Sequence, residues 1–237
     1  MKLICLPYAG SSARVFNTWR NTLLPEIEIK NIELSGRGKR IRETCYKNIA
    51  DAVEDIYNII DKEIDDSPYI IFGHSMGSIL AFELGHKIQQ ENRRMPEAFF
   101  FSGKPAPDQT IKEFVHLYKD VDLIGKIFKL GGTPPELIQN KKLLDIYLPI
   151  IRADYKIVET YKFQDKKKKL NAPFYILYGN KDEFALHEIL AWKNHTSKYC
   201  TFYEFDGGHF FIKEQEKSVL NLINTVFLDE LKIGVYK

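Results

Sequence analysis

The sequence predicts an α/β fold in which helices cover both faces of a mostly parallel sheet. Short apolar runs alternate with segments whose apolar residues recur at helical spacing along the 237 residues, and this alternation is typical of parallel sheets. The run "YIIF" (69–72) is β-branched and aromatic, which is the composition of a strand buried on both faces. The chain is also long enough to form one α/β domain with a substantial core.

Six short apolar segments are predicted strands: "KLICL" (2–6), "IEIKNIEL" (27–34), "YIIF" (69–72), "AFFFSG" (98–103), "FYILYG" (174–179) and "TFYEF" (201–205). Between them, apolar residues at helical spacing predict helices. These residues lie in the segments 16–23, 49–60, 80–88 and 219–227.

Residues 104–170 interrupt this alternation. They contain no convincing core strand and are too many for a simple crossover connection. The glycine pair at 131–132 is expected to stop one helix, Thr133 to cap the next with prolines in its first turn, and Pro149 to kink or divide a later helix. We expect this segment to form a helical lid insertion within a single domain that spans residues 1–237.

Composition and charge argue against several classes of protein. Hydrophobic residues make up 44%, charged residues 28%, and the net charge is +2, so neither a nucleic acid nor a membrane partner is expected. No apolar run approaches a membrane span, and Pro7 and Gly10 interrupt the short apolar N-terminus. Cys5, Cys45 and Cys200 lack CxxC spacing and are interpreted as buried thiols of a cytoplasmic protein. No histidine or cysteine pair has the spacing of metal ligands.

The quintet "GHSMG" (73–77) lies where a predicted strand becomes a predicted helix. Its flanking glycines are what a sharp elbow needs if it is to present Ser75 as a nucleophile. A serine in a glycine turn is also a common structural residue, so this interpretation depends on partners elsewhere in the chain. His74 is expected to pack or to form a hydrogen bond beneath the turn.

Two candidate partners follow later strands. Asp182 comes just after "FYILYG", and His209 lies in the glycine-bracketed loop after the last strand. Taken singly, each is an ordinary loop residue, and Glu183 is a competitor for the role of Asp182. A serine nucleophile needs a base and an orienting acid, and the chain order Ser, Asp, His is that of the α/β-hydrolase fold. We therefore predict this fold, with Ser75 as nucleophile, His209 as base and Asp182 as acid.

Several longer motifs point to one family. Together with the quintet and "GGHFF", the segments "LPYAGSSARVFNTW", "LSGRGKR", "LGGTPPEL" and "LPIIRADY" resemble the type II thioesterases, the stand-alone editing enzymes of nonribosomal peptide and polyketide synthases. The resemblance covers nearly the whole chain. It implies the same three catalytic residues. It also implies an oxyanion hole formed by the backbone N–H groups of Met76 and of Ala9 in the "PYAG" loop.

The sequence departs from the usual family pattern at three positions. Ser35 stands where proline usually precedes "GRG", Ser11 stands where a second glycine often follows "AG", and Asn180 replaces a common glycine ahead of the acid. None of these changes removes a proposed catalytic group.

The resemblance also implies the substrate and the partner. The acyl or aminoacyl group would be attached by a thioester to the phosphopantetheine arm of a carrier protein, and a cytoplasmic, monomeric enzyme would hydrolyse it without a cofactor or metal of its own. Carrier proteins are generally acidic, so basic segments are candidate docking sites. The candidates are the lysine run 166–169 and the group Arg37, Lys39, Arg40 and Arg42. Alternatively, the lysines form a solvated loop and the arginines brace their own turn.

Two other hypotheses stay open from the sequence. One is a medium-chain fatty-acyl-carrier-protein hydrolase, or a generic serine esterase, that uses the same three residues. A wide apolar channel under the lid would favour the long-chain enzyme, and a shallow open bowl would favour editing. The other is a non-catalytic protein that docks carriers. We rank it last, because a scaffold does not need to retain Ser75, Asp182 and His209 together.

Overall fold

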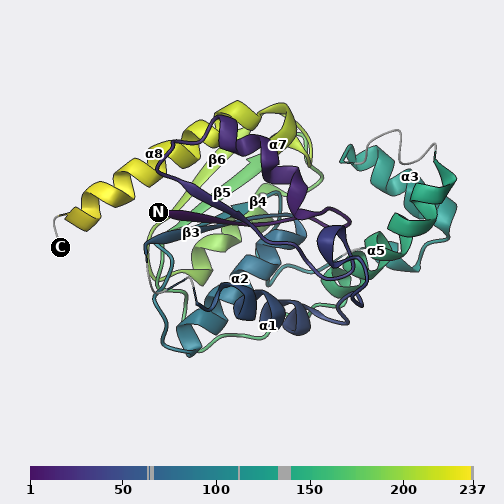
Figure 1. Ribbon diagram of the computed structural model, residues 1–237, viewed down its shortest axis with the longest axis horizontal. Coiled ribbons are helices and arrows are strands. Elements are labelled where there is room, and N and C mark those ends of the chain that lie inside the picture. Colours follow the sequence, from purple (N-terminus) through teal and green to yellow (C-terminus); the bar gives the residue numbers. More distant parts are fainter. Residues whose placement is uncertain (63, 65–66, 112, 133–139, 236–237) are drawn as a thin grey trace.

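A computed structural model describes residues 1–62, 64, 67–111, 113–132 and 140–235. Six strands form one parallel sheet in the order β2-β1-β3-β4-β5-β6 (Figure 1). The strands are β1 (Lys2–Leu6), β2 (Glu28–Asn31), β3 (Tyr69–His74), β4 (Ala98–Ser102), β5 (Phe174–Gly179) and β6 (Cys200–Phe205). Every residue of β3 and β4 is buried, because helices cover both faces of the sheet. The predicted parallel sheet is confirmed.

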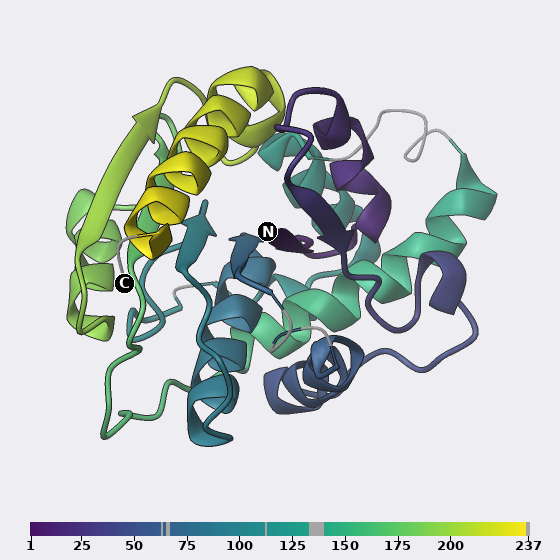
Figure 2. The same ribbon diagram turned by 60° about the vertical axis from the view of Figure 1, so that its left-hand side comes forward.

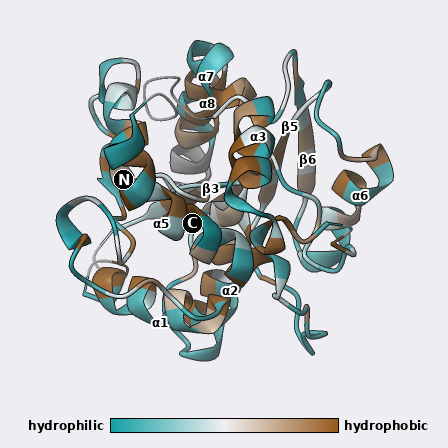
Figure 3. Ribbon diagram, turned by 90° about the vertical axis from the view of Figure 1, so that its right-hand side faces the viewer, coloured by the Kyte–Doolittle hydropathy of each residue, from teal (hydrophilic) through white to brown (hydrophobic). Residues whose placement is uncertain are grey.

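Two hydrophobic clusters fill the space between the sheet and the helices. On one face the sheet packs against α1 (Ile49–Ile60), α2 (Met76–Gln90) and the 3₁₀ helix η4 (Ala191–His195). On the other it packs against the 3₁₀ helix η1 (Ala13–Asn21) and α8 (Glu216–Val235), which lie on the same side in both ribbon views (Figures 1 and 2). The helix α1 carries hydrophobic and hydrophilic residues side by side (Figure 3), as expected for a helix with one face on the core.

Shorter elements complete the connections. They are the 3₁₀ helices η2 (Gly38–Arg40) and η3 (Val115–Leu117), and the short helices α6 (Leu186–Leu190) and α7 (Phe211–Glu214). Among the described residues, no helix combines the length and hydrophobicity that crossing a membrane requires. Cys5, Cys45 and Cys200 are all free, but only Cys5 is fully buried. The other two were wrongly expected to be buried. Cys200 begins the edge strand β6, and Cys45 lies in the loop that follows η2.

The segment between β4 and β5 contains η3, α3 (Asp120–Leu130) and α5 (Lys141–Glu159). The helices α3 and α5 lie to one side of the sheet (Figure 1). Gly131 ends α3 with φ +88°, as the sequence predicts. The expected cap at Thr133 and the prolines after it lie outside the described residues.

Pro149 does not divide α5, which is continuous from Lys141 to Glu159. A proline in a helix removes one backbone hydrogen bond and crowds the preceding turn. Here the residues on either side, Leu148 and Ile151, are buried in a small cluster with α3. This packing holds both halves of the helix in place, so the helix is not divided at Pro149.

Candidate active site

Ser75 lies in a strained turn between β3 and α2. Its φ is +54° and its ψ −112°, a combination that is costly for a residue with a side chain. The backbone segments around this turn approach one another so closely that there is no room for a side chain on either flanking glycine. A Cβ added to Gly73 would lie 2.1 Å from the carbonyl oxygen of Gly77, and one added to Gly77 would lie 2.2 Å from that of Leu6. The two glycines are therefore required by close backbone approach.

The structure brings the three residues predicted as nucleophile, base and acid together. His209 Nε2 lies 2.9 Å from Ser75 Oγ, and His209 Nδ1 lies 2.8 Å from Asp182 Oδ2. The residues follow β3, β5 and β6, whose carboxyl ends meet at one edge of the parallel sheet. The His209 and Asp182 side chains are only 10% and 5% exposed. A carboxylate can only accept, so Nδ1 is the donor in the contact with Asp182, and Nε2 of the neutral ring is left to accept a hydrogen bond from the Ser75 hydroxyl.

Glu183 does not compete for the histidine. Its side chain is exposed and pairs with Lys126 and Lys129, each at 3.4 Å. Its backbone N–H instead donates to Asp182 Oδ1 at 2.8 Å. This contact helps to fix the Asp182 carboxylate for its bond to His209.

His74 is buried beneath the elbow, where the sequence places it. Its Nδ1 lies 2.9 Å from Ser102 Oγ, and its ring centre lies 5.3 Å from that of His209. Burial lowers the pKa of His74 well below its usual value, so the ring is neutral and serves as packing under His209. Gly103 has φ +60° here, and a Cβ on it would lie 2.6 Å from the His74 ring.

Ala9 and Met76, the predicted oxyanion-hole residues, both line the cavity that contains Ser75 and His209. Met76 is the first residue of α2, where backbone N–H groups lack partners within the helix. In the loop after β1, Gly10 N–H donates to Asp154 and Ser11 N–H to Tyr8. Within the described part of the chain, no acceptor is found for Ala9 N–H.

The cavity has a volume of about 740 Å³, in the range of small-molecule sites. Much of its wall comes from the segment between β4 and β5, including Lys104, Tyr155, Glu159 and Phe163. Glu159 is held by the N–H groups of Val115 and His116 at 2.8 and 3.0 Å, whereas burial lowers the pKa of Lys104. The sequence did not identify these wall residues, because nothing in their local pattern separates them from other helical residues.

The described residues contain no group of three or more histidine, cysteine, aspartate or glutamate side chains that could hold a metal ion. The chemical groups present at the elbow are a serine hydroxyl, an imidazole with a buried carboxylate behind it, and open backbone N–H groups. This set is suited to attack on a carbonyl carbon.

Comparison with known proteins identifies the family. A model of the thioesterase domain matches residues 1–227. The chain belongs to the thioesterase family.

The thioesterase is similar to two solved structures from biosynthetic pathways. ClbQ from the colibactin NRPS/PKS pathway is 37% identical with a TM-score of 0.93, and the match covers 98% of both chains. The type II thioesterase BorB from the borrelidin biosynthetic cluster is 32% identical with a TM-score of 0.85, and the match covers 94% of this chain and 90% of BorB. A curated relative, the medium-chain S-acyl fatty acid synthase thioesterase of Anas platyrhynchos, is 32% identical over 90% of this chain and 86% of its own length.

These similarities confirm two sequence-based predictions. The thioesterase has the α/β-hydrolase fold, and its relatives include type II thioesterases of nonribosomal peptide and polyketide pathways. It is a thioester hydrolase, so the hypothesis of a non-catalytic docking protein is set aside.

Proposed function

We propose that this thioesterase hydrolyses acyl and aminoacyl thioesters attached to the phosphopantetheine arm of carrier proteins, and so clears misprimed carriers. The observation that carries the proposal is the hydrogen-bonded chain from Ser75 through His209 to Asp182, all three of which line a cavity of about 740 Å³. Ser75 is the nucleophile, His209 the base and Asp182 the residue that orients the base.

The first half of the reaction acylates the serine. His209 Nε2, 2.9 Å from Ser75 Oγ, accepts the hydroxyl proton as the oxygen attacks the thioester carbonyl. The N–H groups of Ala9 and Met76 stabilise the oxyanion, at about 3 kcal/mol for each donor in comparable sites. The tetrahedral intermediate then expels the phosphopantetheine sulfur, which takes a proton from His209. A thiol is a good leaving group, so little is demanded of this acid.

The second half releases the product. Water enters, His209 accepts its proton, and the hydroxide attacks the acyl-serine carbonyl in the same oxyanion hole. Ser75 then leaves with the proton from His209, and the free acid departs. Each step uses only these side chains and backbone groups, so we propose that the enzyme needs no cofactor or metal.

The acyl specificity distinguishes the proposal from its main alternative. The similarity to the medium-chain enzyme of Anas platyrhynchos supports a fatty-acyl-carrier-protein hydrolase as a second candidate. The cavity wall combines charged side chains at Lys104, Asp108, Glu159 and Glu188 with apolar ones that include Ile79, Phe114 and Phe163, so the lining is compatible with both kinds of acyl group. The similarity to ClbQ and BorB, which come from biosynthetic pathways, supports editing as the first candidate.

The candidate docking residues differ in how exposed their side chains are and in whether they already have ion-pair partners. Arg37 is fully buried, Arg40 binds Glu43 and Asp55, and Lys166 pairs with Glu83 at 2.8 Å. These three therefore brace their own surroundings. The exposed members of the two groups are Lys39, Arg42, Lys167, Lys168 and Lys169. We propose that any electrostatic steering of an acidic carrier comes from these five, and that the enzyme acts as a monomer in the cytoplasm, where its three cysteines stay free.

The test is acyl release from carrier proteins charged with acetyl, aminoacyl and medium-chain fatty-acyl groups, by the wild type and by Ser75→Ala. We expect hydrolysis of acetyl and aminoacyl carriers, and a loss of at least a thousandfold in kcat in the variant. A preference for medium-chain groups would favour the second candidate. Hydrolysis of small esters without release from any carrier would contradict the carrier-protein proposal.

A further inference from the structure

Three family motifs meet at one buried ion pair. Arg37, from "GRG", makes a two-pronged contact with Asp154, from "RAD" on α5. Its Nη2 donates to Oδ1 at 2.8 Å, and its Nη1 donates to Oδ2. The two side chains are only 1% and 2% exposed. The third motif, "PYAG", follows β1, and Gly10 within it donates its N–H to Asp154 Oδ2 at 2.7 Å.

The same pair holds the rest of this loop. Arg37 Nη1 also donates to the carbonyl oxygen of Ser11 at 3.3 Å. Ser11 in turn binds the carbonyl oxygen of Tyr8 twice, through its N–H at 3.1 Å and its hydroxyl at 2.6 Å. The Tyr8 carbonyl and the Ala9 N–H belong to one rigid peptide plane. Fixing the carbonyl therefore fixes the direction of the Ala9 N–H.

The helix α5 also packs directly against the loop that contains Gly10. Gly10 has φ +76°, and a Cβ added to it would lie 2.4 Å from Cγ1 of Ile151. Ile151 and Asp154 are three residues apart and thus lie on one face of α5. One helix face therefore supplies both the packing and the charge that contact the loop.

Stability alone gives a weak reason for burying these charges. Removing two charges from water costs several kcal/mol for each ion, and well-packed apolar residues often replace a buried pair at no loss of stability. What the pair supplies here is geometry. It gives one acceptor, for the Gly10 N–H, and one donor, to the Ser11 carbonyl oxygen, to a loop whose Ala9 N–H has no acceptor of its own among the described residues.

We propose that Arg37 and Asp154 are positioning residues that aim the Ala9 N–H at the developing oxyanion and make the oxyanion hole depend on the docking of α5. The inference rests on the proposed serine thioesterase function and deepens it. Neither side chain touches the substrate; both act through the loop.

The test compares two double variants that are both free of the buried charges. In Arg37→Met/Asp154→Asn, an amide oxygen remains to accept the Gly10 N–H. In Arg37→Met/Asp154→Leu, that acceptor is lost. Arg93→Met/Asp61→Leu is the matched control, because it removes a half-buried Arg–Asp pair that lies between the ends of α1 and α2. Each protein is assayed for kcat and KM on an acyl-pantetheine thioester, for its melting temperature, and for affinity to an alkyl trifluoromethyl ketone, which forms an oxyanion on Ser75.

We expect the leucine double variant to lose about ten- to a hundredfold in kcat, with KM changed by less than about threefold and ketone affinity reduced in parallel. The asparagine double variant keeps the acceptor for the Gly10 N–H but loses the Arg37 donor to Ser11, so its kcat should fall between those of the wild type and the leucine double variant, and the control should keep wild-type kcat. A leucine variant with wild-type kcat and ketone affinity would overturn the inference. So would equal losses in both double variants that follow their melting temperatures, since the pair would then be structural only.

A further variant covers the case in which the leucine double variant does not fold. Ser11→Ala leaves the ion pair intact but removes one of the two bonds to the Tyr8 carbonyl. We expect kcat and ketone affinity each to fall about threefold, the effect of one neutral hydrogen bond, and no change in either would count against the inference. Acyl release that persists in Ser75→Ala would instead contradict the proposed function itself.

Discussion

Ser75 shows how the site depends on individual residues. Its positive φ is unfavourable, and it persists because glycines on both sides let β3, α2 and the end of β1 approach within contact distance. His74 fills the space below with a neutral ring. The serine is thus held in place before any substrate binds, which is what a preorganised nucleophile requires.

Asp182 is the residue whose proposed role can be tested most selectively. In Asp182→Asn the side chain keeps its size, but its amide group favours the histidine tautomer that cannot accept the Ser75 proton. We expect kcat to fall by about 10²- to 10⁴-fold while KM stays within about threefold. Steady-state kinetics on an acyl-pantetheine thioester measures both. Glu183→Gln is the control, because its exposed side chain faces Lys126 and Lys129. A comparable loss in that variant would assign the acid role to Glu183.

At the scale of elements, the sequence predicts a strand or helix correctly where the pattern of apolar residues lies within one short segment. The segments "KLICL" and "FYILYG" coincide with β1 and β5, and the spacing from Ile49 to Ile60 coincides with α1. The candidate site was also predictable, because Ser75, Asp182 and His209 each follow a recognisable strand. In a parallel sheet the carboxyl ends of strands share one edge, so order along the chain becomes proximity in space.

Two other features, the burial of Arg37 and the continuity of α5, depend on contacts between residues far apart in the sequence, which no short segment reveals. Arg37 is found in a charged stretch that favours an exposed turn, yet it is fully buried. Its partner, Asp154, is 117 residues away along the chain. Pro149 favours a break that tertiary packing of Leu148 and Ile151 prevents. In each case the preference of a short segment is overridden by its partners across the fold.

The helix α2 carries a pH-sensitive contribution to stability. His86 is 4% exposed and packs edge-on against Phe82 at 4.7 Å. Burial, with smaller effects from Lys166 and His195 and an opposing one from Glu83, lowers its pKa from 6.5 to about 4. Between these two values the unfolded chain binds a proton that the folded protein does not. Folding stability is therefore lost as the pH falls from about 7 towards 4.

We expect His86→Gln to reduce this loss, since glutamine does not titrate. Between pH 7.5 and 4.5 the wild type should lose about 2–3 kcal/mol more of its unfolding free energy than the variant does. Urea denaturation at the two pH values measures the difference. The exposed His187 provides a matched control, and His187→Gln should lose as much as the wild type. Equal losses in all three proteins would show that His86 is not the group responsible.

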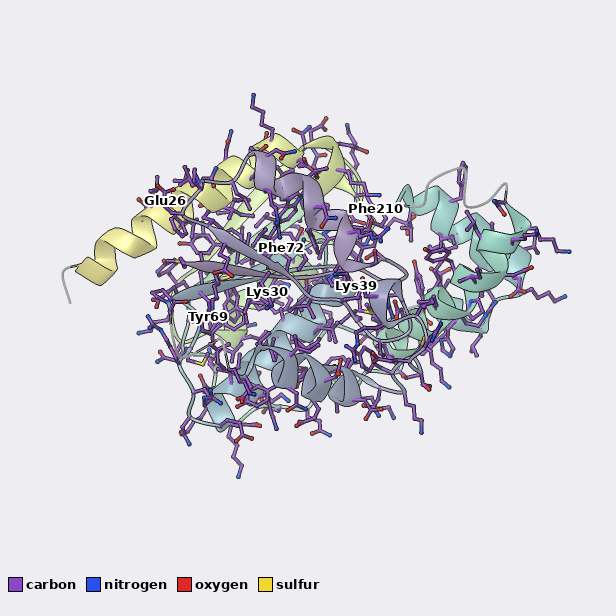
Figure 4. The ribbon with its side chains drawn as sticks, in the orientation of Figure 1. Glu26, Lys30, Lys39, Tyr69, Phe72 and Phe210 are labelled. Carbon is purple, nitrogen blue, oxygen red and sulfur yellow. The ribbon has the colours of Figure 1, made fainter. Side chains whose placement is uncertain are left out.

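At the scale of the whole molecule, α5 connects two regions of the fold. On one side Leu148 and Ile151 join Leu123 and Ile127 of α3 in the small cluster outside the sheet. Further along the same helix, Ile157 belongs to the main core on the sheet. Contacts also run from the residues that follow α3 to α7 and to the loop before it. Lys213 donates to the carbonyl oxygen of Gly132 at 2.8 Å, and Phe210 lies on the side of the sheet that faces α3 and α5 (Figure 4).

These shared contacts predict that residues 104–170 unfold together with the sheet, as one domain. We expect a single heat-capacity peak whose calorimetric and van't Hoff enthalpies agree within about 10%. Ile127→Ala, in the small cluster, and Ile157→Ala, in the main core, each remove a buried side chain and should cost about 2–4 kcal/mol. Both variants should move the same single peak to lower temperature, by about 2–4 °C for each kcal/mol. If Ile127→Ala instead split off a smaller early transition while Ile157→Ala did not, the insertion would be a separate folding unit.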